Sequence, residues 1–450
     1  MKKLSKISLH NLSQAELAKR EENLLRGGGS SVSVYFRNTI LMCLFMKQLF
    51  LILLIITTSC NNNSTNNSNR NSTPNSTNNQ NIPSKQLTLP ILDLKKEYPE
   101  KNIYLQDIAD VEYIALETHE NGLVGGGFNL VTDSLIIAKM NDNVIFFYRN
   151  GNFSHSFNRK GPSGKEYSSM GDIRINTQLK EIYIDDYLRS MIQVYSYEGE
   201  YLRTLKMKHD GFRHGHLFYI DSNNLLWEDI TNVDNQKEKP TNLMPYYKVS
   251  IKDGTMTQLP IKVEKRIRNT LYYHDKEMDK GISIGVSVYP VANINGELIL
   301  TDFAMDTLYA YRNDNLIPIA KKENWWKSNE IPYIVTLDAI TDKYYLWHAV
   351  EKDFKKGILP SKTFLQDRYT GKCIQTELID KNITDENWRF RHRMSANIYM
   401  LPRNHIMQVY PAYKLIELYE DGKLQGELKE IAAKLKLDDN PVLMIAKFRD

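Results

Sequence analysis

The chain has 450 residues, 42% of them hydrophobic and 25% charged, which is the composition of a globular protein with one large β domain or two to three ordinary domains. The formal charge of +4 comes from the first 59 residues, with eight Lys or Arg and three Asp or Glu, so the rest carries about −1. A basic surface for nucleic acid is therefore not expected. The three cysteines, Cys43, Cys60 and Cys373, fit neither a zinc site nor a disulfide framework, and Cys373 is expected to be a buried, inert thiol.

Residues 1–45 form a leader-like extension. Leu17 and Leu24 are seven residues apart, which places them on one face of an expected helix that a glycine run would end. The stretch resembles the leader of a Bacteroidetes family of peptide precursors associated with radical-SAM enzymes, on Leu12, Ser13, Glu16, Leu17, Gly27 and Gly28. In that family a maturation enzyme binds the leader and a peptidase cuts after the double glycine, which implies cleavage at Gly27–Gly28. Two interpretations remain, a gene start at Met46, which is favoured, or a leader fused to a second protein.

Residues 46–60, MKQLFLILLIITTSC, are expected to be an export signal. Lys47 precedes an apolar run from Leu49 to Ile56, which is shorter than the roughly 20 residues that a membrane-spanning helix needs. With small residues before Cys60, the segment resembles a bacterial lipoprotein signal, in which a peptidase cuts before the cysteine and the thiol is acylated. The resemblance implies lipidation at Cys60 and anchoring to a membrane. An ordinary signal that is cut elsewhere is the alternative.

Residues 61–85 are rich in Asn, Ser and Thr and almost free of apolar side chains, so they cannot bury enough surface to offset the entropy of ordering. We expect a disordered tether, whose first 21 residues or so reach roughly 25 Å as a random coil. Asparagines rather than acidic residues follow Cys60. Because surface export in Bacteroidetes often uses acidic residues there, an outer-membrane lipoprotein facing the periplasm is favoured.

From about residue 100 to 450 the sequence consists of short alternating runs rich in aromatic and β-branched residues, which indicate strands. A strand–turn–strand pattern occurs six times at intervals of 48 to 60 residues, with turns at Asn150–Gly151, Glu198–Gly199, Asp253–Gly254, Asn313–Asp314, Thr370–Gly371 and Asp421–Gly422. This spacing is typical of propeller blades and predicts an all-β, six-bladed β-propeller. The strand Val111–Leu116 or the one ending at Phe448 would complete the last blade.

Three stretches resemble Bacteroidetes six-bladed propeller lipoproteins with NHL-like repeats: DVEYIALET, NVIFFYRNGNFSHSFNRKGPSGKEYSSMGDIRI and DDNPVLMIAKF. The resemblance covers roughly residues 100–450 and implies fold and cell-envelope location more than activity. That family typically has an Arg-x-Gly-x-Gly-Pro-x-Glu-Tyr turn. The positions that match it, with the Gly–Pro order shifted, are Arg159, Gly161, Pro162, Glu166 and Tyr167.

The same stretch, RKGPSGKEY, has the glycines and lysine of a phosphate loop. Gly161 and Gly164, however, enclose two residues instead of four, and Glu166 follows Lys165 where the motif requires Ser or Thr. We therefore predict a crossing from the outer strand of one blade to the inner strand of the next, with Lys165 at the surface and no bound nucleotide.

Three groups of residues are candidates for binding. His214 and His216 alternate along an expected strand, which permits a metal ion, although ordinary strand histidines are favoured. Arginines on one face of another expected strand, Arg389, Arg391 and Arg393, could clamp an anionic sugar, carboxylate or phosphate, against the favoured alternative of a solvated face. Trp325 and Trp326 could stack on a sugar or peptide, whereas Tyr344, Tyr345 and Trp347 are expected to pack in the core.

The chain has no Gly-x-Ser-x-Gly, no HExxH and no recurrent Asp-box, so the sequence assigns no nucleophile or general base. The favoured function is that of a non-enzymatic, lipid-anchored envelope propeller that binds a protein, peptide or carbohydrate, without a cofactor. The alternative is a propeller-type hydrolase or lyase acting on glycans or lactones through at least two acidic residues near the axis, with calcium as its candidate cofactor. A third hypothesis, a role in ribosomal peptide natural-product maturation or export, depends only on residues 1–29.

Overall fold

The computed structural model describes thirteen stretches of the chain: residues 33–35, 89–207, 215–230, 243–263, 270–275, 280–285, 292–294, 297–300, 305–312, 314–322, 333–351, 361–386 and 400–449. The expected signal segment, the tether and the lipidation candidate Cys60 lie outside these residues, and so does the candidate cleavage site Gly27–Gly28. No helix in the described part is both long and apolar enough to cross a membrane.

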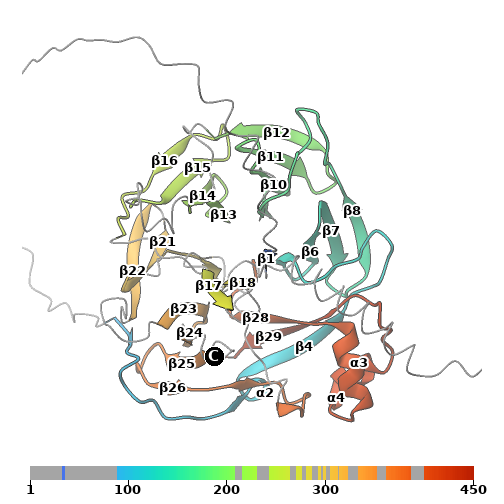
Figure 1. Cartoon of the computed structure of the whole chain (residues 1–450), viewed down its shortest axis with the longest axis vertical. Coiled ribbons are helices and arrows are strands. Elements are labelled where there is room, and N and C mark those ends of the chain that lie inside the picture. Colours follow the sequence, from blue (N-terminus) through green and yellow to red (C-terminus); the bar gives the residue numbers. More distant parts are fainter. Residues whose placement is uncertain are drawn as a thin grey trace, which may run out of the picture.

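Within the described residues, six sheets stand around a common axis, which confirms the six-bladed β-propeller (Figure 1). Blades 1 to 3 are each four-stranded and antiparallel. Blade 1 consists of β5 (Phe128–Val131), β6 (Leu135–Met140), β7 (Asn143–Tyr148) and β8 (Phe153–Phe157), and blade 2 of β9 (Ile173–Asn176), β10 (Glu181–Asp186), β11 (Met191–Ser196) and β12 (Tyr201–Lys206). Blade 3 consists of β13 (Gly215–Tyr219), β14 (Asn224–Asp229), β15 (Tyr246–Ser250) and β16 (Met256–Gln258). The first strand of a blade lies toward the axis and the last at the rim, as β13 and β16 show.

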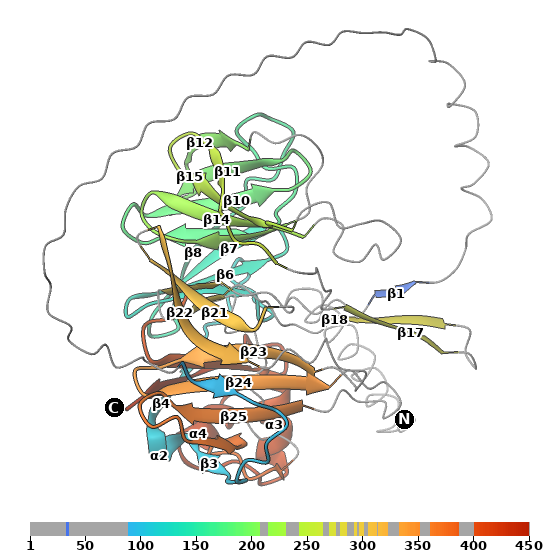
Figure 2. The ribbon, with the colours of Figure 1, turned by 90° about the vertical axis from the view of Figure 1, so that its left-hand side faces the viewer.

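Blades 4 to 6 complete the ring. They consist of β19 (Ala292–Ile294), β20 (Glu297–Leu300), β21 (Thr307–Arg312) and β22 (Asn315–Lys322); β23 (Tyr333–Ile340), β24 (Tyr344–Glu351), β25 (Ser361–Asp367) and β26 (Cys373–Gln375); and β28 (His405–Tyr410), β29 (Val442–Phe448) and β4 (Ala109–Ala115). Between blades 3 and 4 a separate hairpin, β17 (Thr270–Asp275) with β18 (Lys280–Gly285), extends away from the blades and pairs with β1 (Ser33–Tyr35) (Figure 2).

Five of the six predicted hairpins are present, and each has a backbone that only certain residues adopt easily. The glycines of four turns have positive φ, at Gly151 (91°), Gly199 (80°), Gly254 (76°) and Gly371 (70°). In the fifth turn, Asp314 has a φ of 60°. Because glycine and aspartate enter this region at low cost, the turn residues determine where β7 joins β8 and where the equivalent rim hairpins form.

The prediction of a sixth hairpin at Asp421–Gly422 is wrong. The segment forms two helices, α3 (Ala412–Glu420) and α4 (Gly426–Ala432). Leu415 and Leu418 are three residues apart and both fully buried, and Lys414 pairs with Glu417 one turn along, so the periodicity of the segment is helical. Gly422, with a φ of 70°, ends α3 as a C-terminal glycine rather than turning a hairpin.

Both ends of the propeller domain contribute to the last blade. β29, near the C-terminus, pairs antiparallel with β28 on one side and with β4 on the other. The β29–β4 register runs over seven residue pairs from Val442↔Ala115 to Phe448↔Ala109. The two strands that the sequence offered as alternatives for closing the ring therefore close it together.

The segment before β4 lies along the outer edges of blades 4 and 5, and we call residues 89–104 the N-terminal strap. β2 (Ile91–Leu92) pairs parallel with β22, and β3 (Ile103–Tyr104) pairs parallel with β27 (Leu378–Ile379). Tyr98, between them, packs edge-on against Phe364 with ring centroids 5.5 Å apart. The short helix α2 (Leu105–Ile108) then leads into β4.

The core consists of apolar layers between neighbouring blades. Ile137 and Phe146 of blade 1 pack with Ile173 and Ile182 of blade 2 in one such layer, and every other pair of adjacent blades packs similarly. Tyr345 and Trp347 are buried in the layer between blades 4 and 5, and Tyr344 is partly buried against the next, which confirms that these aromatic residues are core residues. Cys373 is a free, half-buried thiol whose pKa burial raises to about 12.

Candidate functional site

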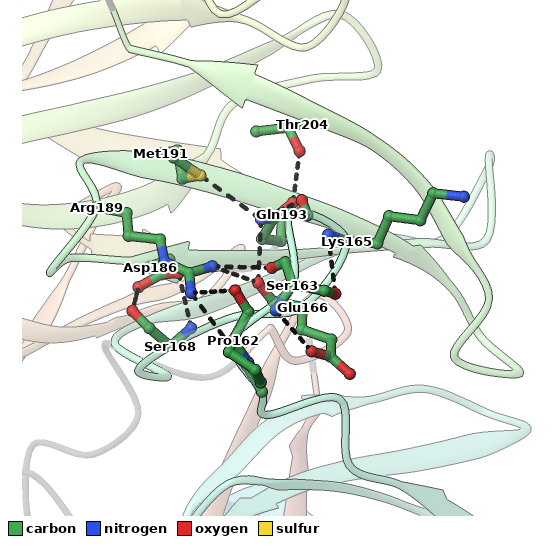
Figure 3. Close-up of polar contacts among 12 residues, drawn as sticks. Pro162, Ser163, Lys165, Glu166, Ser168, Asp186, Arg189, Met191, Gln193 and Thr204 are labelled. Carbon is green, nitrogen blue, oxygen red and sulfur yellow. Dashed lines mark hydrogen bonds and ion pairs between the residues drawn. The ribbon is translucent and has the colours of Figure 1, made fainter.

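Residues 159–167 form the predicted crossing from β8 of blade 1 to β9 of blade 2, and several of their carbonyl groups accept hydrogen bonds from side chains of blade 2 (Figure 3). The Arg189 guanidinium donates to four of these carbonyls at 2.8 to 3.4 Å, those of Gly161, Pro162, Ser163 and Glu166. The Gln193 amide donates to the carbonyls of Gly164 and Glu166 at 3.3 Å each. A cation and an amide from β10–β11 thus fix the shape of the loop.

This geometry differs from that of a phosphate loop, in which backbone N–H groups point at the anion. Here the Ser163 N–H donates to the Glu166 carboxylate at 2.9 Å, so the loop binds its own anion. This backbone hydrogen bond holds the pKa of Glu166 below its ordinary value. Lys165 is exposed, as predicted, with Nζ 5.9 Å from the centre of the Tyr201 ring.

A second anchor fixes the chain where it leaves the loop and enters β9. Ser168 donates to the buried Asp186 carboxylate from its N–H at 2.8 Å and from its hydroxyl at 2.6 Å. Two backbone hydrogen bonds follow, from Gly171 N–H to the Asp185 carbonyl at 2.8 Å and from Asp185 N–H to the Asp172 carbonyl at 2.9 Å. The loop therefore positions Asp172 beside the end of β10.

Asp172 is the centre of a group of charged residues from blades 1, 2 and 3, which we call the inner-strand cluster: Lys139, Asp172, Arg174, Asp185 and His216. One oxygen of Asp172 accepts from the Leu217 N–H at 3.0 Å and lies 3.5 Å from His216 Nδ1 and 3.6 Å from Arg174 Nη2. Lys139 Nζ, from blade 1, donates to the carbonyls just before Asp172, at Met170 (3.0 Å) and Gly171 (2.5 Å).

The cluster holds its carboxyl groups in different protonation states. Burial would raise the pKa of Asp172, but Arg174 and the hydrogen bond with His216 outweigh it, so the pKa lies well below its ordinary value. For Asp185, burial and then the charge of Asp172 raise the pKa to about 8. Asp172 is thus ionised at neutral pH, and Asp185 is mostly protonated.

The two basic side chains differ as well. Burial would lower the pKa of His216, yet the hydrogen bond and charge of Asp172 raise it above its ordinary value. Burial lowers the pKa of Lys139, and the charge of Asp172 opposes that shift. Neighbouring carboxyl groups with pKa values pushed apart, beside an imidazole, are an arrangement that can bind a polar ligand or transfer protons.

The cluster differs in accessibility from a second acid–imidazole pair in blade 5. There His348 Nδ1 lies 3.8 Å from an oxygen of Asp338; the Asp338 side chain is fully buried and that of His348 is 12% exposed. Burial lowers the pKa of His348 to about 4 and raises that of Asp338 well above its ordinary value. In the inner-strand cluster the side chains of Asp172 and His216 are 29% and 27% exposed, so a ligand can reach them.

Of the residues proposed from the sequence, the structure brings His216 into the cluster. The others lie outside the described residues: His214, Trp325, Trp326, Arg389, Arg391 and Arg393. No group of three or more His, Cys, Asp or Glu side chains in the described part is arranged to hold a metal ion. Sequence reasoning missed Asp172, Arg174 and Asp185; the signal available was charge at strand positions that end up buried, as in IYIDD of β10.

The fold and the cluster define a six-bladed β-propeller with a cluster of charged residues contributed by its first three blades. The family model described as "Domain of unknown function (DUF4934)" matches residues 89–447, so the chain belongs to this family. None of the curated proteins compared matches the chain.

The chain is similar to three solved structures, of which the first supports the propeller fold. The crystal structure of a "putative exported protein" from Bacteroides fragilis NCTC 9343 matches 81% of this chain and 100% of its own, with a TM-score of 0.54 and 12% identity. A member of the DUF4221 family from Bacteroides vulgatus matches 76% of this chain and 99% of its own, with a TM-score of 0.45 and 11% identity. Virginiamycin B lyase from Staphylococcus aureus matches 59% of this chain and 98% of its own, with a TM-score of 0.28 and 7% identity. A similarity of this extent says nothing about activity.

Proposed function

We propose that this protein is a cell-envelope propeller, anchored through an acylated Cys60, that binds a polar ligand at the inner-strand cluster without transforming it. The observation that supports it is the partly exposed Asp172–His216 pair, held in place from three blades by Arg174, Lys139 and the Leu217 N–H. A rigid ring with preorganised polar groups is suited to binding, because little entropy is lost when the ligand arrives.

Binding can be tested on the full chain carrying Cys60→Ala, which removes the acylation site. Calorimetry would use three probes at pH 7: neutral oligosaccharides, oligogalacturonates and short peptides. We expect one class to bind and Asp172→Asn or His216→Gln to weaken that binding by about tenfold, the loss of roughly one charge-assisted hydrogen bond. Asp133→Asn, an exposed acid on another turn, is the matched control. If both Asp172→Asn and His216→Gln bind the probe as tightly as the parent chain does, the cluster is not the binding site.

The proposed lipid anchor is inferred from the sequence of residues 46–60, and it can be tested separately. Metabolic labelling with a tagged fatty acid in a Bacteroidetes host should label the wild-type chain and not Cys60→Ala. Protease treatment of intact cells should leave the propeller uncut if it faces the periplasm. Removal of the domain from intact cells would show that it faces outward instead.

A second candidate function, a hydrolase or lyase for glycans or lactones, is favoured by one observation. Asp172 and Asp185 are adjacent carboxyl groups in opposite protonation states, which is how acid–base enzymes divide their two roles. Chromogenic glycosides and lactones would serve as substrates, with product release followed from pH 5 to 9. Turnover that Asp185→Asn abolishes, while binding persists, would establish the enzyme; binding without turnover would leave the binding function.

A further inference from the structure

An aromatic side chain lies beside the inner-strand cluster. Tyr187 follows the end of β10 and is 37% exposed, with Leu188, 54% exposed, next to it. A Cβ atom built on Gly171 would lie 3.4 Å from Cδ1 of Tyr187, so the ring lies against the backbone one residue before Asp172. The turn that carries Tyr187 is fixed by the Arg189 N–H, which donates to the Asp186 carbonyl at 3.0 Å.

The cations of the cluster are committed to partners within the chain. Lys139 donates to two carbonyls, and Arg174 donates to the Ile173 carbonyl at 2.5 Å, pairs with Asp172 and lies 5.3 Å from the centre of the Phe218 ring. The exposed part of the site is then a carboxylate beside an imidazole. An anionic ligand would meet the charge of Asp172, and a cationic one would meet the guanidinium of Arg174, so a neighbouring charge of the same sign opposes a fully charged ligand of either kind.

Beneath these groups lies a carboxyl that lacks part of its hydrogen bonding. Asp185 is 2% exposed, and its Oδ1 has no hydrogen-bond partner among the described residues. Its Oδ2 is 2.9 Å from the position of a Cβ on Gly171, so only a glycine there leaves room for this carboxyl beside Tyr187. An unsatisfied buried acid of this kind is costly and is found more often at ligand sites than elsewhere.

We propose that the ligand is an uncharged saccharide, whose ring stacks on Tyr187 and whose hydroxyl groups bond to Asp172 and His216. This inference rests on the proposed binding function and names its ligand class. A sugar hydroxyl both donates and accepts, which suits a carboxylate beside an imidazole, and the C–H face of the sugar suits a half-exposed tyrosine ring. A peptide or an anionic glycan is the alternative that the experiment separates.

The test compares neutral oligosaccharides with oligogalacturonates and short peptides on the full chain carrying Cys60→Ala. We expect neutral oligosaccharides to bind, Tyr187→Ala to weaken them by about tenfold, and Tyr187→Phe to bind within about threefold of wild type, because stacking needs the ring and not the hydroxyl. Tyr148→Ala removes another exposed tyrosine, 52% exposed on β7, and should bind as wild type.

The outcomes distinguish this inference from the function on which it rests. Oligogalacturonates or peptides that bind in an Asp172-dependent way, with no binding of neutral oligosaccharides, would overturn the saccharide and retain the binding site. Neutral oligosaccharides that bind equally to Tyr187→Ala would overturn the stacking. Probes that bind equally well to the parent chain and to Asp172→Asn would overturn both the saccharide inference and the proposed binding site. Circular dichroism of each variant shows that it is folded before it is compared.

Discussion

Asp380 is a buried residue that follows β27 and accepts several hydrogen bonds from residues around the last blade. Its carboxylate accepts from the Tyr113 hydroxyl at 2.7 and 2.8 Å, the Tyr410 hydroxyl at 3.0 Å, the Gln106 amide at 2.7 Å and the Asn382 N–H at 3.0 Å. Burial and the charge of Asp380 raise the pKa of Tyr113 and of Tyr410 above the ordinary value, so both hydroxyls stay protonated. This carboxylate therefore joins β4, β28 and α2.

We expect Asp380→Ala to lower the free energy of unfolding by about 3 to 5 kcal/mol, because it removes the carboxylate that accepts from two buried hydroxyls. Urea denaturation followed by fluorescence measures the change. Glu112→Ala is the control: its side chain is 53% exposed and pairs with Arg149, so the loss should be under about 1 kcal/mol. Equal losses in the two variants would show that Asp380 does not join these elements.

The pKa of Asp185 makes stability depend on pH. The folded chain holds the proton of Asp185 up to about pH 8, whereas an unfolded aspartate loses it near its ordinary value of 3.8. Between these values the folded state binds more protons, so stability falls as pH rises, by at most about 1.4 kcal/mol per pH unit from this group. Asp185→Asn keeps the shape without the titration.

We therefore expect the stability of Asp185→Asn relative to wild type to increase steadily from pH 4.5 to 7.5. Urea denaturation at four pH values in this range gives the two curves. Taking the difference between them removes the titration of groups that both chains share. Parallel curves would mean that Asp185 does not hold its proton in the folded state.

At the scale of single residues, the sequence allowed one residue of the cluster to be identified but not the residues that surround it in the fold. His216 was identified as a polar residue on a strand, but its partner Asp172 is 44 positions earlier, on another blade. A charged residue before a strand, such as Asp172, has the same local pattern whether it faces solvent or a neighbouring blade. Only the contact between blades 2 and 3 distinguishes these cases.

At the scale of elements, the glycines of the rim hairpins occupy equivalent turn positions but have different neighbouring atoms. Gly151 and Gly371 both have positive φ, but a Cβ on Gly151 would lie 2.2 Å from the Ala115 carbonyl oxygen, whereas a Cβ on Gly371 meets nothing within 4 Å. We expect Gly371→Ala to cost about 1 kcal/mol from backbone strain alone, and Gly151→Ala to cost about 3 kcal/mol or more, because backbone atoms must also move. Thermal and urea denaturation measure both losses. Similar losses would indicate that the end of β4 shifts freely.

The hairpins could be predicted because turn chemistry and alternation are local. The same reasoning was wrong at Asp421–Gly422, because a glycine after an acidic residue serves equally as the end of a helix. The spacing of Leu415 and Leu418 distinguishes the two, and their burial in the core beneath blade 6 stabilises the helix. The six-fold count was still correct, because β28, β29 and β4 supply the blade that this hairpin was expected to form.

At the scale of the whole molecule, the ring depends on the pairing of β4 with β29. A chain that ends at Asn440 lacks β29, whose residues from Val442 to Ala446 are all buried. We expect this truncation to lose the cooperative unfolding transition and to be cut rapidly by protease, because blade 1 and blade 5 lose their common neighbour. A chain that begins at Leu89 should unfold as the full chain does. A sharp transition in the C-terminal truncation would show that the ring does not need this closure.

The N-terminal strap also determines where the chain that precedes it joins the ring. Pro90, whose carbonyl accepts from the Lys321 N–H at 2.8 Å, lies at the outer edge of blade 4, beside β22. If Cys60 is acylated as proposed, the tether expected at residues 61–85 would attach to the rim and leave the ring free to turn relative to the membrane. Attachment at the rim keeps the tether away from both openings of the ring, so a ligand can enter from either end.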